Sequence, residues 1–574
     1  MSYRDEYEKW LQADAVDEAT RRELRDIAGD EEQIEDRFSG MLQFGTAGLR
    51  GRMRAGLNGM NVYTVRYATQ GMANLIKSCG EDPGSGVTIA YDSRSNSRLF
   101  AEQAAAVLAA NEIHVHLFDD LRPTPELSFA IRETGSIAGI NITASHNPKE
   151  YNGYKAYWSD GAQLPPEHAA QVSASMERID IFDDVLTCEF ADAVESGRVA
   201  WLGEEMDERY MEQVLAQSVG GRYVRQAADD FEIVYTPFHG AGCRLVPEVL
   251  HRLGIRRLIP VAEQMKPDGD FPTVASPNPE NAEGFAMAIA LAASRGVDLI
   301  IGTDPDSDRC GAVVRSGEEY QVLSGNQIGV LLLDYLITLR RENGTLPADA
   351  AAVKSIVSTP MFNKICAVNG VTAVETLTGF KFIGEKIKEF EETGAHTFLF
   401  GFEESLGFLA GTYARDKDAV VAAMLIAEMG CWYKTRGMTL YDGLQELYRR
   451  YGYYREVTKS IVFEGLDAQQ RMQQLMAQLR RRHPAAIGLP VRRVRDYQQG
   501  TVTDLADGAT VPTGLGRSDV LFYELEDDCA AVVRPSGTEP KIKLYVMARG
   551  DDAGAADQRF TAILEAGTAL LQKA

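Results

Sequence analysis

The chain has 574 residues, and a typical domain of about 150 residues predicts roughly four domains. Hydrophobic residues make up 45% of the chain and charged residues 25%, which is ordinary for a globular protein and argues against disorder. The formal net charge of −24 argues against nucleic acid or an anionic membrane surface as the main partner. A small anionic substrate stays possible, because charges are screened over about 8 Å at physiological salt and a basic pocket can form locally.

The cysteines, the apolar runs and the N-terminal stretch indicate where the protein is located. The cysteine pattern favours a reducing compartment. The seven cysteines include no Cys-x-x-Cys pair, which speaks against a zinc site or a small disulfide framework. The longest apolar runs, such as AVVAAMLIA at 419–427, are well short of a membrane span of about 20 residues. The N-terminal stretch MSYRDEYEKWLQADAVDEATRREL is charged and helix-like, unlike a signal peptide. We therefore expect free thiols and a cytoplasmic location.

Several apolar, β-branched runs end in a polar loop and lead into a helical pattern. In chain order they are VTIAYDSRSNSR, SIAGINITASHNP, FEIVYTPFHGAG, DLIIGTDPDSDR, VKSIVSTPMF and FLFGFEESLGF. This alternation predicts α/β domains, in which ligand sites lie beyond the carboxyl ends of the strands. The polar loops are therefore the places where chemistry is expected.

Three changes of pattern predict the domain boundaries. A charged helical stretch gives way to Gly220-Gly221 near 205–225, and further changes fall near 320–325 and 449–457. Beyond the last change the order becomes a strand, a helix, three strands and a final helix, which is typical of an α+β domain. We predict three related α/β domains and a C-terminal α+β domain, with bounds 1–215, 216–322, 323–452 and 453–574.

The motif GTDPDSDRCG places Asp304, Asp306 and Asp308 at alternate positions. Three carboxylates this close repel one another unless a cation lies among them, and oxygen ligands select Mg²⁺, Ca²⁺ or Mn²⁺. An EF-hand is excluded, because Arg309 and Arg315 occupy the positions of its glycine and its glutamate. Two alternatives stay open: a solvated acidic turn, and a phosphatase loop in which Asp304 attacks phosphorus.

Two further loops suit a phosphorylated sugar. VVRPSGTEPKIKLYV combines a guanidinium, hydroxyls, a glycine and lysines, which fits a phosphate monoester, although a hairpin turn with surface lysines has the same composition. GFEESLGF offers Glu403, Glu404 and Ser405 to sugar hydroxyls, although a helix N-terminus favours acidic residues too. With the serine-bearing loop TASHNPKEYNGYK, these loops supply what phosphoryl transfer needs.

The motifs resemble those of the α-D-phosphohexomutase family over nearly the full chain. They are FGTAGLRG, TASHNPKEYNGYK, GTDPDSDR, TLTGFKFIG, GFEESLG and RPSGTEPKIKLY, in that family's order. TLTGFKFIG and GFEESLGF look most like the branch that contains bacterial phosphoglucomutases and animal phosphopentomutases. The resemblance implies four domains around a central active-site cleft. It also implies that glucose 1-phosphate and glucose 6-phosphate are interconverted through a phosphoserine and glucose 1,6-bisphosphate, which serves as intermediate and activator.

The resemblance further implies roles for individual residues. Ser145 would be the phosphoserine, and one of its phosphate oxygens would join Asp304, Asp306 and Asp308 around Mg²⁺. Lys155 would be the general acid/base. The residues implied close to the reacting groups are Arg50, His146 and Arg309. Those implied to hold the sugar and the non-reacting phosphate are Lys381, Glu403, Ser405, Arg534, Ser536, Gly537 and Thr538.

One departure from the family leaves the preferred sugar open. Some phosphomannomutase-type members carry a histidine where this chain has Phe380. The alternatives are phosphomannomutase or phosphopentomutase specificity, a bisphosphate synthase, and a metal-dependent sugar phosphatase that uses Asp304. The expected partners are small-molecule sugar phosphates, the expected oligomeric state is a monomer or weak dimer, and the C-terminal domain is expected to be mobile.

Overall fold

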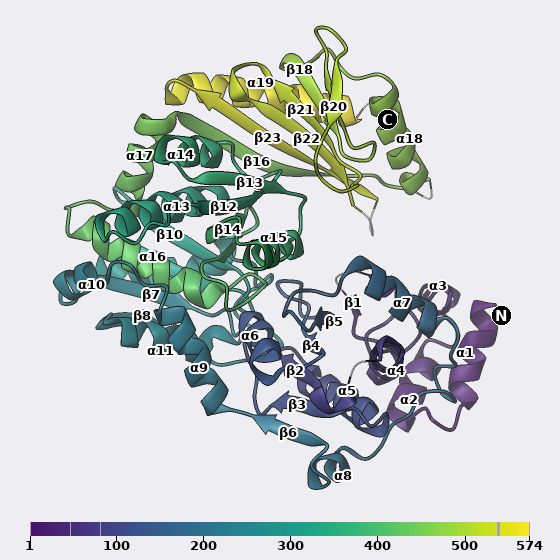
Figure 1. Cartoon of the computed structure of the whole chain (residues 1–574). Helices are drawn as coiled ribbons and strands as arrows, with labels where there is room; N and C mark the ends of the chain where they lie inside the picture. Colours follow the sequence, from purple (N-terminus) through teal and green to yellow (C-terminus); the bar gives the residue numbers. More distant parts are fainter. Residues whose placement is uncertain (1, 46–47, 81, 466, 537–539, 573–574) are drawn as a thin grey trace. The chain divides into compact units, whose positions relative to one another are not determined.

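The computed structural model describes residues 2–45, 48–80, 82–465, 467–536 and 540–572. These residues form two compact units (Figure 1). Unit 1 comprises Met1–Gly325, Gly384–Glu392 and Ser405–Thr439, and unit 2 comprises Asn326–Ile383, Thr393–Glu404 and Leu440–Ala574. Helix α15 (Phe380–Thr393) contributes residues to both units. In the described part of the chain, no helix is both long enough and apolar enough to cross a membrane.

The first sheet of unit 1 has the strand order β1-β5-β4-β2-β3-β6. Its strands are β1 (Leu49–Arg52), β2 (Val87–Tyr91), β3 (Val115–Phe118), β4 (Ala138–Ile142), β5 (Tyr151–Trp158) and β6 (Val199–Leu202). Strand β2 runs parallel to β3 and β4, whereas β5 is antiparallel to β4. Strands β2 and β4 are buried along their whole length, as expected for continuous apolar runs covered by helices on both faces. The loop after β4 carries Ser145.

Helices cover this sheet, and the first three of them form the N-terminal part of the chain. They are α1 (Tyr3–Gln12), α2 (Glu18–Asp26), α3 (Glu31–Phe38), α4 (Val62–Cys79), α5 (Ser97–Ala110), α6 (Thr124–Thr134), α7 (Pro166–Met176) and α8 (Phe190–Glu195). The N-terminal helices dock through edge-to-face contacts of Trp10 with Phe38, Tyr63 and Phe182, at ring-centroid distances of 5.2 to 5.8 Å. Such aromatic pairs stabilise beyond the area that they bury.

The second sheet of unit 1 has the strand order β11-β10-β9-β7-β8. Its strands are β7 (Glu232–Thr236), β8 (Arg257–Pro260), β9 (Leu299–Thr303), β10 (Cys310–Ser316) and β11 (Glu319–Val322). Strands β9 and β10 form an antiparallel pair, and the loop between them carries the three aspartates. The accompanying elements of unit 1 are α9 (Glu204–Leu215), α10 (Gly221–Ala227), α11 (Gly242–Leu253), α12 (Ala286–Arg295), β15 (Gly407–Leu409) and α16 (Ala419–Lys434). The run 419–427 lies in α16, which is buried on every side.

Unit 2 begins with a parallel three-strand arrangement in the order β13-β12-β14. Its elements are β12 (Ala350–Ser355), β13 (Thr372–Thr376), β14 (Thr397–Glu403), α13 (Gly325–Glu342), α14 (Met361–Asn369) and α17 (Leu440–Tyr451). The carboxyl ends of β12 and β14 lead into the loops that carry Ser358 and Glu404.

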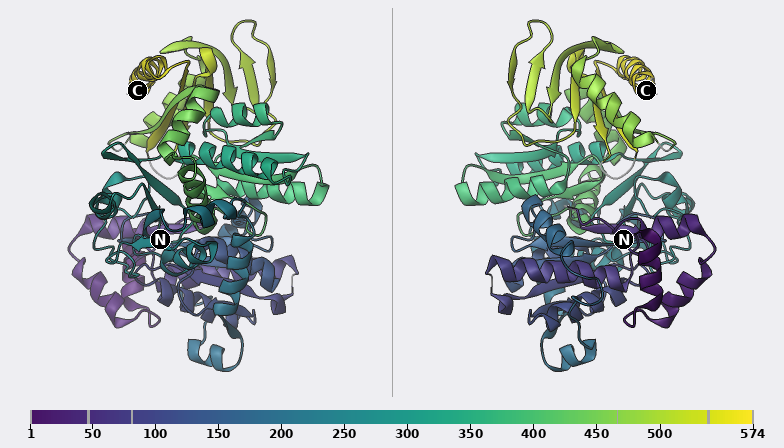
Figure 2. Two further views of the ribbon diagram at one scale, coloured as in Figure 1. Left: turned by 90° about the vertical axis from the view of Figure 1, so that its left-hand side faces the viewer. Right: turned by 90° about the vertical axis from the view of Figure 1, so that its right-hand side faces the viewer.

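The C-terminal part of unit 2 is a large antiparallel sheet in the order β16-β23-β22-β21-β18-β19-β20, with β17 paired to β18. Its strands are β16 (Tyr453–Val462), β17 (Ala486–Ile487), β18 (Leu489–Asp496), β19 (Thr501–Asp504), β20 (Thr510–Pro512), β21 (Leu521–Leu525), β22 (Ala530–Pro535) and β23 (Lys541–Gly550). Helices α18 (Ala468–Arg481) and α19 (Ala553–Gln572) share one apolar core with this sheet. Figure 2 shows the β19–β20 hairpin extending beyond the other strands.

The predicted fold class is confirmed: the chain combines α/β layers with a C-terminal α+β domain. The prediction of three strands between the last two helices was wrong, because the described residues between α18 and α19 form seven strands, β17 to β23. Several of them are only two to four residues long, and β19 and β20 show no alternation of buried and exposed residues. Such strands carry little periodic signal in the sequence. The predicted domain bounds stay predictions.

A buried carboxyl group on α6 predicts a pH-dependent stability. Glu126 is fully buried, and neither carboxyl oxygen has a hydrogen-bond partner among the described residues. Burial raises the pKa of Glu126 to about 8. An unfolded glutamate titrates near pH 4.3, so the folded chain loses stability as the pH rises from about 4.5 toward 8, by about 1.4 kcal/mol for each unit of pKa difference.

We therefore expect Glu126→Gln to remove this decline. The midpoint of denaturant-induced unfolding, measured from pH 5 to 8, should fall with pH in the wild type more steeply than in Glu126→Gln. The matched control is Glu133→Gln, an exposed glutamate on the same helix, whose pH profile should follow the wild type. Parallel profiles for the wild type and Glu126→Gln would refute the assignment.

Candidate active site

The loop after β4 holds Ser145 in a constrained, buried position. Its φ angle is 52°, in the left-handed region that residues other than glycine rarely adopt, and the residue is 3% exposed. The Ser145 hydroxyl donates to Asp304 Oδ2 at 2.9 Å and lies 3.2 Å from Nδ1 of His146. The main-chain N–H of Ser145 donates to Thr143 Oγ1 at 2.8 Å. This serine therefore faces the aspartate loop of the second sheet.

Arg94 holds the main chain of this loop and was not singled out from the sequence. Its guanidinium donates to the carbonyl oxygens of Pro148 at 2.9 Å and Tyr151 at 3.0 Å, and also to those of Ser145 and Asn147. The Arg94 side chain is fully buried.

Further groups connect Arg94 to the serine loop and to the second sheet. Asp92 pairs with Arg94 at 3.3 Å and accepts from the Thr143 hydroxyl at 2.6 Å. The guanidinium also lies 5.1 Å from the ring centroid of Phe271. The only sequence signal was Asp-Ser-Arg directly after a buried strand, which is too short to be specific.

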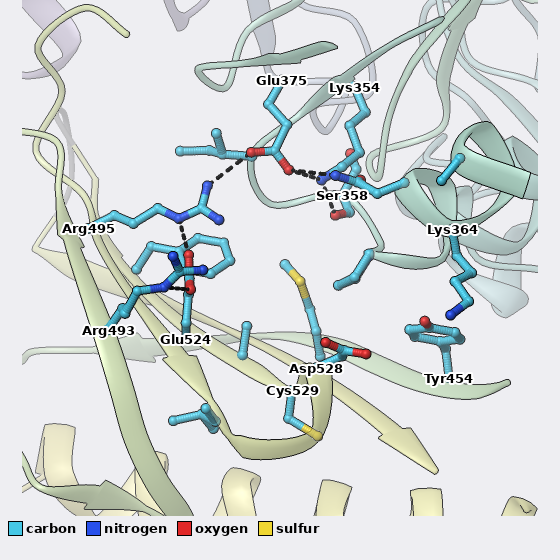
Figure 3. Close-up of a pocket in the computed structure, with 18 residues that line it drawn as sticks. Lys354, Ser358, Lys364, Glu375, Tyr454, Arg493, Arg495, Glu524, Asp528 and Cys529 are labelled. Carbon is cyan, nitrogen blue, oxygen red and sulfur yellow. Dashed lines mark hydrogen bonds and ion pairs between the residues drawn. The ribbon is translucent and has the colours of Figure 1, made fainter. Parts of the chain in front are cut away.

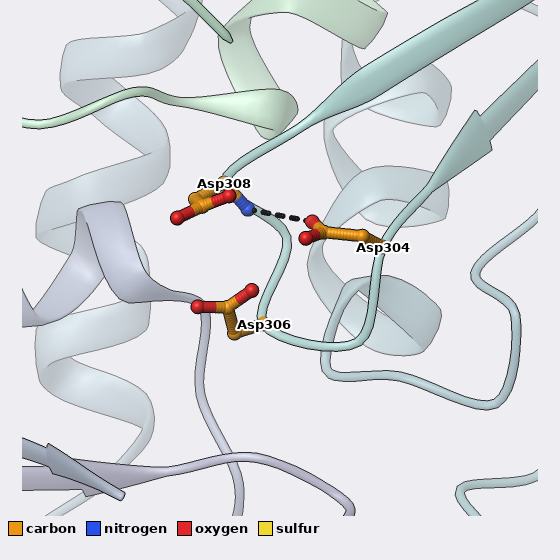
Figure 4. A group of neighbouring side chains, drawn as sticks. All are labelled: Asp304, Asp306 and Asp308. Carbon is orange, nitrogen blue, oxygen red and sulfur yellow. Dashed lines mark hydrogen bonds between the residues drawn. The ribbon is translucent and has the colours of Figure 1, made fainter. Parts of the chain in front are cut away.

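The three aspartates converge in the β9–β10 loop (Figure 4). Asp304, Asp306 and Asp308 are at most 2% exposed, and each offers a carboxylate oxygen within 4.8 Å of the others. Asp304 Oδ1 accepts from the main-chain N–H groups of Asp308 at 3.1 Å and Arg309 at 2.9 Å. The alternative of a solvated acidic turn is wrong, because these carboxylates are buried.

Two lysines neutralise part of this negative charge. Lys155, on β5, donates to Asp306 Oδ2 at 2.6 Å and to Asp308 Oδ2 at 2.9 Å. Lys417 lies 3.4 Å from Asp308 and donates to Asp416 at 2.9 Å. Sequence reasoning missed Lys417, because its motif Asp-Lys-Asp is more than 100 residues from the aspartate loop and resembles an ordinary surface turn.

Burial and charge move the pKa values of these groups apart. Burial, reinforced by repulsion from Asp306 and Asp308, raises the pKa of Asp304 well above its ordinary value. Burial also opposes the ionisation of Asp308, but the ammonium groups of Lys155 and Lys417 outweigh it and lower its pKa. For Lys155, burial favours the neutral amine, whereas the attraction of Asp306 and Asp308 outweighs it and raises the pKa. Lys155 is therefore protonated in this arrangement.

The donor set fits a hard divalent cation. Asp306 Oδ1 and Asp308 Oδ1 are buried and have no hydrogen-bond partner among the described residues. An unsatisfied buried carboxylate oxygen is costly, and a divalent cation would satisfy it. Three carboxylates without nitrogen or sulfur ligands suit Mg²⁺, which takes oxygen ligands and keeps positions for water or phosphate.

The other residues predicted for this part of the site lie nearby. Arg50 is exposed on β1 and donates to Asn147 Oδ1 at 3.2 Å. Arg309 pairs with Glu280 at 3.3 Å. Burial, together with the guanidinium groups of Arg309 and Arg50, holds the pKa of His146 well below its ordinary value, so its imidazole is neutral near pH 7. Unit 1 thus brings Ser145, His146 and Lys155 together with the aspartate loop.

Unit 2 carries most of the residues predicted for the sugar and the distant phosphate. Glu403 ends β14 and accepts from the main-chain N–H of Gly379 at 2.7 Å, so it fastens the loop that precedes Lys381. Residues 404–406 form a turn, so the helix-capping alternative for the two glutamates is wrong.

Of the remaining predicted residues, the structure describes Arg534, Ser536 and Ser405. Arg534 lies near the end of β22, and the main-chain N–H of Ser536 donates to the carbonyl of Lys541 at 2.8 Å. Gly537 and Thr538 lie outside the described residues. Ser405 belongs to unit 1.

If the aspartate loop binds a divalent cation, the cation should stabilise the folded chain. We expect Mg²⁺ to raise the midpoint of thermal unfolding of the wild type, since a ligand at about 100 times its Kd stabilises by about 2.7 kcal/mol. Asp306→Asn should lose most of this gain, because it removes one ligand charge. Asp270→Asn, at an exposed aspartate, is the matched control and should respond like the wild type. Equal Mg²⁺ responses in Asp306→Asn and the wild type would exclude the site.

Comparison with known proteins places the chain in one family. Models described as phosphoglucomutase/phosphomannomutase, alpha/beta/alpha domains I, II and III and the C-terminal domain, match residues 41–181, 208–317, 324–451 and 487–562. A phosphoglucomutase of Staphylococcus epidermidis is 37% identical over 543 residues, covering 94% of this chain and 95% of that protein. One of Staphylococcus saprophyticus is 34% identical over 555 residues, covering 96% and 98%.

Solved structures show the same fold at lower sequence identity. A putative phosphomannomutase of Thermus thermophilus has a TM-score of 0.68 at 22% identity and covers 93% of this chain and 99% of its own. The Paramecium phosphoglucomutase pp63/parafusin has a TM-score of 0.69 at 18% identity, with coverage of 94% and 95%. The family predicted from the motifs is confirmed: the chain belongs to the phosphoglucomutase/phosphomannomutase family.

Proposed function

We propose that the protein is a phosphohexomutase that interconverts α-D-glucose 1-phosphate and glucose 6-phosphate through a phosphoserine at Ser145. The observation that carries this proposal is the buried Ser145 hydroxyl, 2.9 Å from Asp304 in a loop of three carboxylates that Lys155 faces. The relatives at 34 to 37% identity are phosphoglucomutases, which supports glucose phosphates as the substrate. The C-terminal domain is proposed to move during the cycle, and the protein to act in the cytoplasm as a monomer or weak dimer.

In the first step, phosphoserine transfers its phosphoryl group to the free hydroxyl of the bound sugar phosphate. The bond from Ser145 Oγ to phosphorus breaks as the bond from the sugar oxygen to phosphorus forms. We assign Lys155 the proton transfer: it gives a proton to Ser145 Oγ and takes up the proton of the sugar hydroxyl. Lys155 thus ends as it began, and its raised pKa fits this protonated starting state.

Asp304, Asp306 and Asp308 are the residues that would hold Mg²⁺. A magnesium ion bound there supplies positive charge next to the transferring phosphoryl group. Lys155 pairs with the same Asp306 and Asp308 that would face the cation. A cation held by these carboxylates would weaken the attraction that raises the pKa of Lys155, and Lys155 would then give up its proton more easily.

The sugar bisphosphate then turns over and returns its other phosphate to Ser145. For this step we assign Arg534, Ser536, Gly537 and Thr538 to the phosphate that does not react. Lys381, Glu403 and Ser405 are assigned to the sugar hydroxyls. Arg50, His146 and Arg309 are assigned to the reacting phosphate, whose charge two guanidinium groups can offset.

Two observations bear on the alternatives. Phe380, the position that raised the question of phosphomannomutase specificity, is 2% exposed at the start of α15, so its side chain packs in the protein interior. A phosphatase that attacks through Asp304 is disfavoured, because Asp304 Oδ1 accepts two main-chain N–H groups and Oδ2 accepts the serine hydroxyl. Phosphopentomutase or phosphomannomutase specificity remains the alternative within the family.

The proposal is tested by ³¹P NMR of the purified protein with Mg²⁺, glucose 1-phosphate and a trace of glucose 1,6-bisphosphate. We expect conversion to glucose 6-phosphate without inorganic phosphate, and less conversion of mannose and ribose phosphates. Ser145→Ala should abolish turnover while the fold persists, because a loop hydroxyl contributes little to core packing. Ser159→Ala, at an exposed turn, is the control. Wild-type rates in Ser145→Ala, or release of inorganic phosphate, would contradict the proposal.

Arg94→Lys tests the positioning of the serine loop. Lysine keeps the positive charge but cannot reach several carbonyl oxygens at once, so we expect kcat to fall about 10- to 100-fold with little change in KM. The control Arg98→Lys changes an exposed arginine that pairs with Glu102 at 3.0 Å, and its kinetics should match the wild type. A raised KM with unchanged kcat in Arg94→Lys would show that Arg94 acts on substrate binding instead.

A further inference from the structure

Unit 2 contains a pocket that the proposed mechanism does not use. It has a volume of about 400 Å³, which lies in the range of small-molecule sites. It is formed between the β12–α14 segment and the strands β16, β18, β21 and β22 of the C-terminal sheet (Figure 3). The residues that line it include none of those assigned above to the substrate, the metal or the reacting phosphate. Any ligand of this pocket is therefore recognised by residues other than those of the proposed active site.

One wall of the pocket is a chain of alternating charges. Glu375 lies 3.1 Å from Lys354 Nζ and 3.0 Å from Arg495 NH1. Glu524 pairs with Arg495, and it also pairs with Arg493 at 2.6 Å. Three cations thus share two carboxylates. Lys364 and Asp528 complete the charged lining and leave it with one net positive charge on a chain of formal charge −24. An anion is therefore the ligand that this wall favours.

Several donors around the pocket are uncommitted. Arg493 is 53% exposed, and of its nitrogen atoms only Nε bonds to another described residue. Lys364 Nζ and the Tyr454 hydroxyl, on the opposite side of the pocket, make no hydrogen bond to any described residue. Tyr454 is only 6% exposed, and its hydroxyl lies at the edge of the pocket as a donor.

The floor of the pocket is apolar. Ile356, Phe522 and Met547 are buried and belong to one hydrophobic cluster that joins the β12 loop to the C-terminal sheet. The guanidinium of Arg495 lies 4.9 Å from the ring centroid of Phe522, so it covers part of this surface. An inorganic ion would leave the floor without contacts, whereas an organic body would cover it.

We propose that this pocket binds a small organic anion, a carboxylate or phosphate ester with an apolar body, that acts as an effector of the enzyme. Its anionic group is held by Arg493, beside Arg495 on the charged wall, and its body rests on Phe522 and Met547. Lys364 and the Tyr454 hydroxyl meet a further polar group of the ligand on the opposite side. Bidentate recognition by a guanidinium is the strongest of these interactions.

The effector role rests on a path to the loop that bears Glu403, and on the function proposed for that loop. Lys354 donates to the carbonyl oxygen of Ser358 at 3.0 Å. The hydroxyls of Ser355 and Ser358 donate to Glu404 at 3.0 and 3.4 Å. An anion that draws Arg495 toward itself weakens the pair of Arg495 with Glu375, and Lys354 then shifts relative to Ser358 and Glu404. Turnover should therefore change when the pocket is occupied.

Phthalate is a suitable probe, because it combines two carboxylates with an aromatic ring, and neutral phthalamide is its uncharged counterpart. Binding to the full chain is measured by isothermal titration calorimetry without Mg²⁺. We expect phthalate to bind with a Kd of about 1 mM or tighter and phthalamide not to bind. Saturating glucose 1,6-bisphosphate should leave phthalate binding unchanged, because the two occupy different sites.

Two variants locate the probe. Arg493→Gln combined with Lys364→Gln should weaken phthalate binding roughly tenfold or more, since each loses a charged hydrogen bond. Arg492→Gln is the matched control: Arg492 neighbours Arg493 on β18, pairs with Glu526 and does not line the pocket. Undiminished affinity in the double variant, displacement by glucose 1,6-bisphosphate, or equal binding of phthalamide would overturn the site.

The effector role is tested separately by turnover. Saturating phthalate should change the kcat of the wild type and of Arg492→Gln, and should leave that of the double variant unchanged. Binding by calorimetry without any change in turnover would overturn the effector role. Because binding is measured without substrate, the site can be refuted even if the proposed mutase reaction fails, and the two failures are distinguishable.

Discussion

The mutual repulsion of three buried carboxylates is the constraint on which the rest of the site depends. Asp304, Asp306 and Asp308 are placed together by a tight loop between two antiparallel strands, away from the water that would otherwise screen them. Main-chain N–H groups, the Thr124 hydroxyl and two ammonium groups offset part of this cost. Two buried oxygens still have no hydrogen-bond partner among the described residues, and a divalent cation would satisfy them.

The same constraint explains how the first two sheets are arranged in unit 1. Lys155 and Ser145 lie on and beside strands of the first sheet, and both bond to the loop of the second sheet. Thr124, at the start of α6, bonds to Asp306 through both its main chain and its hydroxyl. The carboxylates therefore act as the common acceptor for groups from several elements, and the same negative charge that would attract a cation also fixes the geometry of the serine.

The sequence predicted the parts of the site that are local and missed those that depend on long-range contacts. Ser145 and the aspartates were found because each stands in a polar loop after an apolar strand. Arg94 and Lys417 were missed because their roles depend on main-chain carbonyls or carboxylates that the fold brings to them. The α/β organisation was predictable from buried, β-branched runs, whereas the short strands of the C-terminal sheet have no periodic signal.

The backbone conformation of Ser145 limits which hydroxyl-bearing residue this position can accept. At a φ of 52°, a β-branched side chain is strongly disfavoured. Threonine, the other aliphatic hydroxyl among the amino acids, would therefore strain a loop that Arg94 holds in place. Asparagine and aspartate tolerate the conformation but offer no alcohol. The choice of serine is thus set by the shape of the main chain as well as by chemistry, and an evolutionary exchange of serine for threonine would first require the loop to be rebuilt.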